Sequence, residues 1–206
     1  GAAGPYNFLG RTVHTASGAA ATTIQQAETT AAGTLRTCDD AAILEISVCP
    51  TGSVTTGTVT VANDEFTSTT AGGAFPFRVI NVGGSKVFLR ASASIGSTRR
   101  FIVGMPATDS FEAGTFLGGT TEPAWGTVTL DATSYSGSGT STAGVTSTRT
   151  GSAAPVSGGT TLRSMLLINT ADSGAFFATR SAEIGVLLAA RANPVAPGFM
   201  AIGKRQ

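Results

Sequence analysis

The stretch AFPFRVINVGGSKVFLRASA, residues 74–93, carries the strongest fold signal in this 206-residue chain. Two apolar runs with alternating side chains are separated by Gly83 and Gly84. Alternation with a period of two predicts β-strands that each bury one face. A glycine pair supplies the positive φ that a tight hairpin turn requires. We therefore predict a β-hairpin here.

The alternation assigns each residue of this hairpin to a face. Five apolar residues share the predicted buried face: Phe75, Phe77, Val79, Val87 and Leu89. Three basic residues take the predicted outward face: Arg78, Lys86 and Arg90. Pro76 lacks a backbone donor, which favours an edge or a bulge at the start of the first strand. The stretch therefore indicates a unit of a sheet and no catalytic element.

The rest of the chain has more strand signals than helical ones. Alternating or β-rich runs occupy seven further segments: 42–48, 53–62, 99–104, 126–132, 161–169, 175–180 and 183–191. Segment 20–37 has room for one or two helical turns, although it is rich in Thr, a poor helix former. The low-complexity segment 134–159 fits a long exposed loop or edge strands. Strands without interleaved helices predict an all-β fold, namely an antiparallel β-sandwich of the jelly-roll kind.

Composition predicts three regions along the chain. Residues 38–191 contain the strand signals and form the predicted β-sandwich domain. Residues 1–37 and 192–206 are rich in Ala, Gly or Pro and poor in charge. We expect them to be extended N- and C-terminal arms that become ordered on neighbouring subunits.

Charge is scarce throughout the sequence. Charged residues make up 12% of the chain, where roughly 25% is usual, and the net charge is +1. A near-neutral surface promotes association, which favours a component of an assembly; a secreted Ser/Thr-rich β-domain is the alternative. The first 35 residues contain a single basic residue, Arg11, so we expect no genome-condensing arm and no specific nucleic-acid binding. No run of 18 apolar residues occurs, so we expect no membrane span.

The two cysteines, Cys38 and Cys49, flank the predicted strand 42–48. The ends of a straight strand of this length lie too far apart for a disulfide. A bridge would require a bend between the two residues. We therefore favour two free thiols.

Residues that carry chemistry are few and scattered. The single histidine, His14, lies in a Gly/Ala-rich segment, and two cysteines with one histidine do not make the usual structural zinc site. No Gly-x-Ser-x-Gly elbow or phosphate-binding loop is present. The acidic residues fit solvated turns and an outward strand position better than a calcium site: Asp39–Asp40, Asp64–Glu65 and Glu45. We expect no catalytic residue, cofactor or metal, and no enzymatic activity.

Three residues are candidates for a subunit or ligand contact. Trp125, the only tryptophan, lies in TEPAWG, which we predict to be a turn. It fits a core edge or a subunit contact, and it is also the best available platform for stacking a sugar. Arg99 and Arg100 form a basic pair in an otherwise neutral chain.

The predicted hairpin also carries a resemblance. FPFRVINVGGSKVFLRAS, followed by RRFIVGMPATDSFEAG, resembles a strand–turn–strand pattern of small virion-associated proteins of tailed phages, in which RVxNxG turns into xVFxRxG. The resemblance spans about residues 74–114. It implies a β-sandwich accessory or decoration protein on a virion, and it brings no catalytic residues.

These observations together predict a non-enzymatic structural protein of the virion, assembled in the host cytoplasm. We expect a capsid decoration or outer-shell subunit that acts through contacts with copies of itself and with other capsid proteins. A main coat subunit and a tail component are alternatives within this class. A secreted adhesin or glycan-binding module is the alternative from another class.

Overall fold

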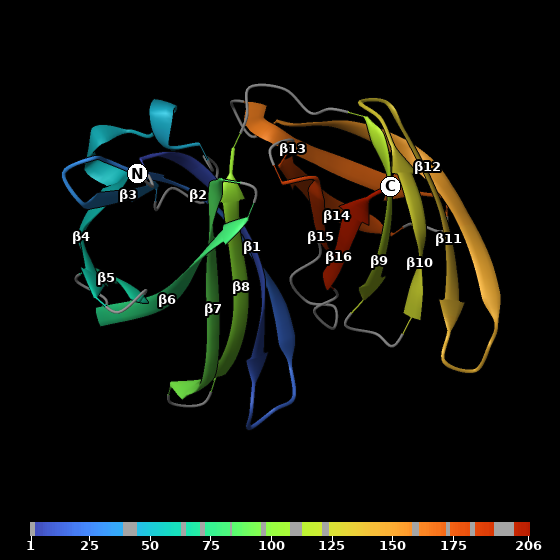
Figure 1. The fold of residues 1–206 in the computed structure, drawn as a ribbon, viewed down its shortest axis with the longest axis horizontal. Helices are drawn as coiled ribbons and strands as arrows, with labels where there is room; N and C mark the ends of the chain where they lie inside the picture. Colours follow the sequence, from blue (N-terminus) through green and yellow to red (C-terminus); the bar gives the residue numbers. More distant parts are fainter. Residues whose placement is uncertain are drawn as a thin grey trace.

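The computed structural model describes most of the chain. The described residues are 3–38, 45–62, 65–70, 73–82, 84–95, 98–107, 113–120, 124–157, 161–171, 174–181, 184–191 and 200–206. Over these residues the chain forms sixteen β-strands and two short 3-10 helices, η1 (Ile46–Val48) and η2 (Thr51–Ser53). The strands form two closed antiparallel barrels, which Figure 1 shows side by side.

The first barrel contains the first eight strands: β1 (Gly4–His14), β2 (Ala20–Thr29), β3 (Thr34–Cys38), β4 (Val54–Ala62), β5 (Glu65–Thr70), β6 (Gly73–Val82), β7 (Ser85–Ile95) and β8 (Thr98–Pro106). Each strand pairs with the next one in the sequence. The barrel closes where β8 pairs with β1, with Val103 opposite Leu9.

The second barrel repeats this up-and-down order with the last eight strands: β9 (Gly114–Thr120), β10 (Ala124–Leu130), β11 (Ser134–Ser141), β12 (Thr146–Ser157), β13 (Thr161–Thr170), β14 (Ala175–Ser181), β15 (Val186–Arg191) and β16 (Met200–Arg205). It closes where β16 pairs with β9, with Gly203 opposite Gly118. An alanine at Gly118 would place its Cβ 1.9 Å from the carbonyl oxygen of Ile202, so this closing pair needs a glycine.

The prediction of an all-β antiparallel fold is confirmed, whereas the sandwich and jelly roll are not. Consecutive strands are neighbours throughout both sheets, and each sheet closes on itself. Alternation tells which face of a strand is buried, but a sandwich and a closed barrel bury alternate residues in the same way. The pattern that we used therefore does not distinguish them.

The two predicted arms are strands of the barrels. Segment 1–37 contributes β1, β2 and most of β3, and the helical turns for which 20–37 had room are not formed, because Ala20–Thr29 is a strand. Tyr6 and Leu9 are buried, at 4% and 0% exposure, so this segment supplies core as well as backbone pairing. In the predicted C-terminal arm, β16 closes the second barrel, and residues 192–199 lie outside the described part.

The hairpin of residues 74–93 forms β6 and β7, and Gly84 in its turn has φ +91°. Gly83 lies outside the described residues. The predicted faces hold for Phe77 and Val79 of β6, which pack inside the barrel. For β7 they hold only in part: Val87 is buried and Leu89 is partly buried, as predicted, but Phe88 is the residue that lies inside the barrel, at 1% exposure.

An aromatic cluster fills the interior of the first barrel. The ring centroids of Tyr6 and Phe88 are 4.6 Å apart in an edge-on arrangement, and Phe8 and Phe77 are 5.7 Å apart. Gly104 faces this cluster, and a Cβ there would lie 2.3 Å from the Phe8 ring. The interior therefore alternates large and small residues, as small barrels require.

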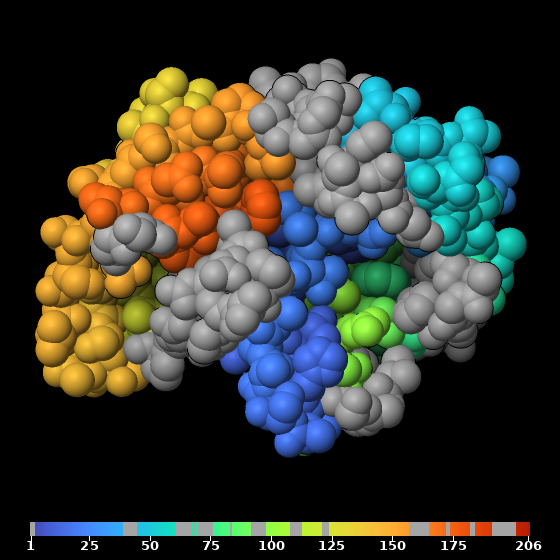
Figure 2. Space-filling model, turned by 180° about the vertical axis from the view of Figure 1, so that it is seen from behind, coloured from blue at the N-terminus to red at the C-terminus, as the bar shows by residue number. Residues whose placement is uncertain are grey.

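Val87 and Leu89 of β7 point out of the first barrel and are nevertheless covered. They join Leu9 and Val103 in a cluster with residues of the second barrel, among them Met165, Leu188 and Ala190. Figure 2 shows the blue β1–β2 region against the orange part of the second barrel. We call this cluster the seam. The seam explains why alternation did not identify the residue of β7 that lies inside the barrel, because this strand buries side chains on both of its faces.

A buried polar chain accompanies the seam. Asn7 of β1 donates from Nδ2 to Oγ1 of Thr179 on β14, at 3.0 Å. Gln26 of β2 donates from Nε2 to Oδ1 of Asn7, at 3.1 Å. All three residues are at most 1% exposed. Buried amides that bond to each other stabilise one arrangement of the two barrels, because any shift would leave them unsatisfied.

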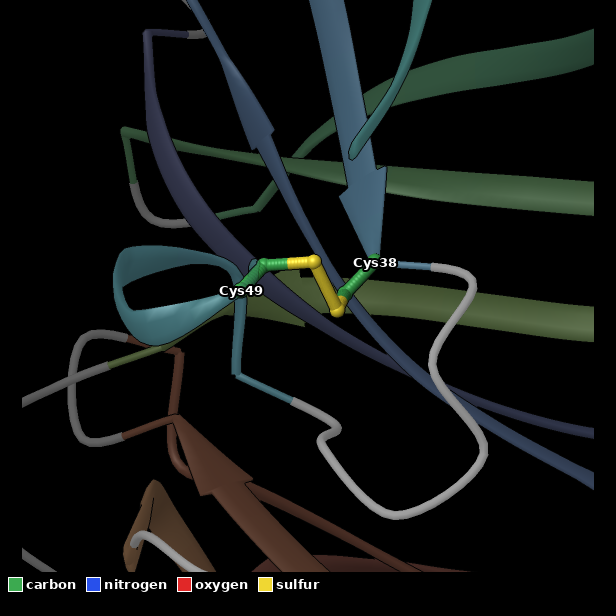
Figure 3. The surroundings of a disulfide bond; sticks show 2 residues. All are labelled: Cys38 and Cys49. Carbon is green, nitrogen blue, oxygen red and sulfur yellow. A yellow bond between two sulfur atoms is a disulfide. The ribbon is translucent and has the colours of Figure 1, made fainter. Parts of the chain in front are cut away.

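The expectation of two free thiols is wrong. Cys38, at the end of β3, and Cys49, just after η1, form a disulfide with their Cα atoms 5.7 Å apart (Figure 3). The predicted strand 42–48 is not observed where the structure describes it, because Ile46–Val48 is a 3-10 helix. Residues 42–44 lie outside the described part. The chain between the cysteines therefore has the bend that a disulfide needs.

Replacing Phe88 with alanine tests the assignment of faces. We expect Phe88→Ala to lower the free energy of unfolding by roughly 3–5 kcal/mol, because it empties a fully buried site. Val145→Ala in the β11–β12 turn is the control, since Val145 is 66% exposed, and should change it by less than about 0.5 kcal/mol. Urea titration of both variants measures the difference, and equal effects would show that Phe88 is not a core residue.

Thiol titration tests the disulfide. Unfolded, unreduced protein should show no reactive thiol, and a reductant should lower the free energy of unfolding by about 2–3 kcal/mol, since the bridge closes a short loop. The double variant Cys38→Ser/Cys49→Ser should not respond to the reductant. Two reactive thiols in unreduced protein would contradict the bridge.

Candidate functional site

The three residues singled out from the sequence lie on different barrels. Trp125 lies on β10 of the second barrel, within a strand and not in the turn that we predicted. Arg99 and Arg100 lie on β8 of the first barrel. Arg99 is exposed, whereas Arg100 is partly buried on the same side of β8 as the interior residue Ile102. The structure therefore divides the basic pair between two faces.

Trp125 belongs to an exposed apolar patch on the second barrel. It is opposite Gly119 on β9, and Gly119 is opposite Ile202 on β16. Leu117 lies on the same face, two residues before Gly119. Trp125 and Ile202 are each 53% exposed, and Leu117 is 50% exposed. We call these three large side chains the apolar patch.

The apolar patch differs from the other exposed large hydrophobic residues of the described chain. Those residues lie in four separate places, on η1, β6 and β8 and in the β11–β12 turn: Val48, Ile80, Phe101 and Val145. Scattered apolar residues are ordinary on a protein surface, whereas a contiguous group marks an interaction site. The patch spans three neighbouring strands in one row, with Gly119 leaving the space between Trp125 and Ile202 open.

Hydroxyl groups surround the patch on the same outer face. Thr140 of β11 is opposite Trp125, and its hydroxyl lies 2.9 Å from that of Thr146. Thr115 and Thr129 make a similar pair at 2.9 Å. The charge nearest in register is Lys204, opposite Leu117. An apolar centre with a polar rim, here hydroxyl groups and Lys204, is the usual anatomy of a protein interface.

The interior of the first barrel contains a small cavity of about 50 Å³, lined mainly by apolar residues: Phe8, Gln25, Ala27, Thr29, Leu35, Thr37, Phe77 and Phe88. Sites for organic ligands usually measure about 300–1,000 Å³. The cavity has space for a few water molecules only, so it is too small for such a ligand.

Each barrel also buries an arginine beside an aromatic ring. The guanidinium of Arg90 lies 5.9 Å from the centroid of Phe77, and that of Arg180 lies 5.4 Å from the centroid of Phe116. Burial lowers the pKa of Arg90, and the like charge of Arg100 lowers it further. Arg90 is 5% exposed, so its predicted outward position is wrong. Cation–π contacts of this kind offset part of the cost of burying the charge.

No metal-binding cluster occurs in the described part of the chain. No three His, Cys, Asp or Glu residues gather there in a way that could hold a metal ion. His14 is exposed at the end of β1. Glu45, predicted to point outward from a strand, precedes η1, is 7% exposed and accepts a hydrogen bond from Ser47. The two predicted acidic pairs fall on residues whose side chains lie outside the described part.

Helices that could cross a membrane are likewise absent among the residues that the structure describes.

Comparison with known proteins adds no relative. No protein-family model matches this chain, and neither curated proteins nor solved structures give a significant match.

Sequence reasoning found Trp125 but missed its two neighbours in the patch. Leu117 lies in TFLGGT, where two glycines interrupt the alternation that predicts a strand. Ile202 lies in a segment that we predicted to be an arm. The signal that could have found them is the row across β10, β9 and β16, which exists only after the barrel closes.

Titration of Asp131, in the turn after β10, tests the geometry at the other end of the strand that carries Trp125. Its carboxylate accepts hydrogen bonds from the backbone N–H groups of Thr133 and Ser134, both at 2.7 Å, and from both hydroxyls. These bonds, the Thr133 N–H foremost, lower the pKa of Asp131 from 3.8 to about 2. Carboxyl chemical shifts followed by NMR should therefore show a midpoint near pH 2.

The lowered pKa of Asp131 also makes the free energy of unfolding depend on pH. A carboxyl whose pKa is lower in the folded state stabilises the fold above its unfolded pKa, and this contribution is lost as pH falls from about 4 through about 2. Replacing Thr133 and Ser134 with alanine should raise the Asp131 midpoint towards 3.8, because two of the four bonds disappear. An unchanged midpoint in that variant would contradict the turn.

Proposed function

We propose that this chain is a non-enzymatic structural subunit of a virus particle, a decoration or outer-shell protein that acts through protein–protein contacts. The observation that carries the proposal is the apolar patch of Leu117, Trp125 and Ile202, half-exposed on a rigid closed sheet. The phage-like pattern at residues 74–114 supports the placement on a virion.

The energetics fit repeated, individually modest contacts. Burying a Leu or Ile side chain completely contributes about 1.5–3 kcal/mol, and the three residues of the patch are already about half covered. One such contact is therefore modest. Many identical contacts on a particle add up through multivalency, without requiring any single contact to be strong.

Low charge supports the same function. A net charge of +1 leaves little electrostatic repulsion between copies. The outer face of β10, β11 and β12 presents mainly hydroxyl groups, which cost far less to bury than charges when they find hydrogen-bond partners in the contact. A main coat subunit and a tail component would use the same properties.

A glycan-binding module is the second candidate, because Trp125 is exposed beside Thr140. Sugars stack on exposed aromatic rings and bond to neighbouring hydroxyl groups. This candidate predicts that a glycan quenches or shifts Trp125 fluorescence in a saturable way. The structural function predicts no such response from monomeric sugars.

Measurement of native mass tests the proposed function. We expect the purified chain to form a defined oligomer whose population rises with concentration, because its neutral apolar patch is more stable when covered. Sedimentation velocity over a range of concentrations measures this, and a panel of monosaccharides and oligosaccharides with fluorescence detection is run in parallel. A compact monomer at the highest concentration, together with a saturable sugar response, would replace the structural function with glycan binding.

A further inference from the structure

The two barrels have the same order of strands, so their faces can be compared strand by strand. β9, β10 and β16 hold in the second barrel the places that β1, β2 and β8 hold in the first. In both cases the first strand pairs with the second and with the last. The outward rows across these strands are therefore equivalent surfaces of two similar barrels.

In the first barrel this surface is covered. Its central row consists of Ile24, Leu9 and Val103, with Leu9 opposite both partners. Leu9 is 0% exposed and Val103 is 3% exposed. The cover is supplied by β13, β14 and β15 of the second barrel, through Met165, Leu188 and their neighbours in the seam.

In the second barrel the equivalent surface is the apolar patch. The row Trp125, Gly119 and Ile202 matches the row Ile24, Leu9 and Val103. Trp125 and Ile202 are about half exposed, whereas Leu9 and Val103 are buried and Ile24 is partly buried against the seam. The outward row of the first barrel is thus covered by the second barrel, whereas the matching row of the second barrel is open.

The apolar patch is also continuous with the seam. Ile202 on β16 is opposite Leu188 on β15, and Leu188 is fully buried between the two barrels. Apolar surface therefore runs without a break from the covered seam to the open patch. The intramolecular contact indicates what kind of surface fits it, namely the outer face of a second barrel.

We propose that the apolar patch binds a second copy of this chain, on the outer face of β5 and β6 of its first barrel. This proposal rests on the proposed function as an assembly subunit. β5 and β6 hold the places of β13 and β14, which provide part of the cover in the seam; β15, which provides Leu188 and Ala190, corresponds to β7, and β7 is itself covered there. Ile80 of β6 is 41% exposed on that face and is the apolar residue that meets the patch.

Two variants test the two sides of this contact. Trp125→Ser/Ile202→Thr removes the patch, and Ile80→Lys places a charge on the opposite surface. Each changes exposed residues, so the melting temperature by circular dichroism should stay near that of the wild type. Each should weaken self-association measured by sedimentation velocity by about thirtyfold or more, as loss of a central interface residue does. Val145→Ser, also on an exposed apolar residue, is the matched control and should associate normally.

Mixing the two variants tests the direction of the contact. The Ile80 variant keeps an intact patch, and the patch variant keeps an intact β5–β6 face. An equimolar mixture should therefore form one-to-one dimers, although neither variant associates alone. If the patch instead met its own counterpart on the second copy, the Ile80 variant alone would associate like the wild type and the proposal would be overturned.

The remaining outcomes separate this proposal from the proposed function. Oligomers of wild-type protein that persist in the patch variant would overturn the contact and leave the assembly function standing. A wild type that stays monomeric at every concentration would overturn both. A patch variant that associates normally, together with a saturable sugar-dependent shift of Trp125 fluorescence in the wild type, would overturn the contact and assign the patch to a glycan.

Discussion

The middle parts of strands β1, β7 and β8 are buried on both faces, and the placement of the two barrels follows from this. Successive residues of each strand enter two different cores: Phe8 and Leu9, Phe88 and Leu89, and Ile102 and Val103. The first member of each pair fills the first barrel, and the second packs in or against the seam. Closing the first barrel therefore also shapes the surface that receives the second. The buried bonds among Asn7, Gln26 and Thr179 fix the register of that contact.

The strand signals of the sequence were informative where alternation separates apolar from polar residues. The hairpin of β6 and β7 and the strands β4, β8, β10, β13, β14 and β15 were predicted near their observed bounds. β11 and β12 were not, because their outer residues are Ser and Thr and several of their inner residues are Gly, so no apolar alternation remains. Barrel closure, the bend that brings Cys38 to Cys49, and the apolar patch depend on contacts between distant residues. Local pattern does not encode such contacts, and only Trp125 of the patch was found from the sequence.

The buried arginines show a related limit. A basic residue in a strand is normally assigned to the solvent face, and Arg90 was so assigned. Arg90 and Arg180 instead lie inside the barrels, against Phe77 and Phe116, and Arg180 donates to the carbonyl oxygen of Ala113 at 3.1 Å. An eight-stranded barrel has room for long side chains along its axis. A guanidinium that stacks on a ring and bonds to backbone carbonyls can therefore occupy a position that a residue-by-residue hydropathy argument excludes.

Closure of both sheets has a consequence for how this chain resists aggregation. An open sheet ends in a strand whose backbone N–H and C=O groups face solvent and can recruit a strand from another molecule. In the described part of this chain every strand has two hydrogen-bonded neighbours. The chain has a net charge of +1, so it lacks the repulsion that keeps many proteins apart. Its pairing limits the free backbone edge to short stretches, such as Ala20–Gln26 of β2 and Thr146–Thr150 of β12, each of which pairs on one side only. Away from these stretches, recognition between molecules runs through side chains on the outer faces, where single substitutions can tune it without disturbing the backbone ladder.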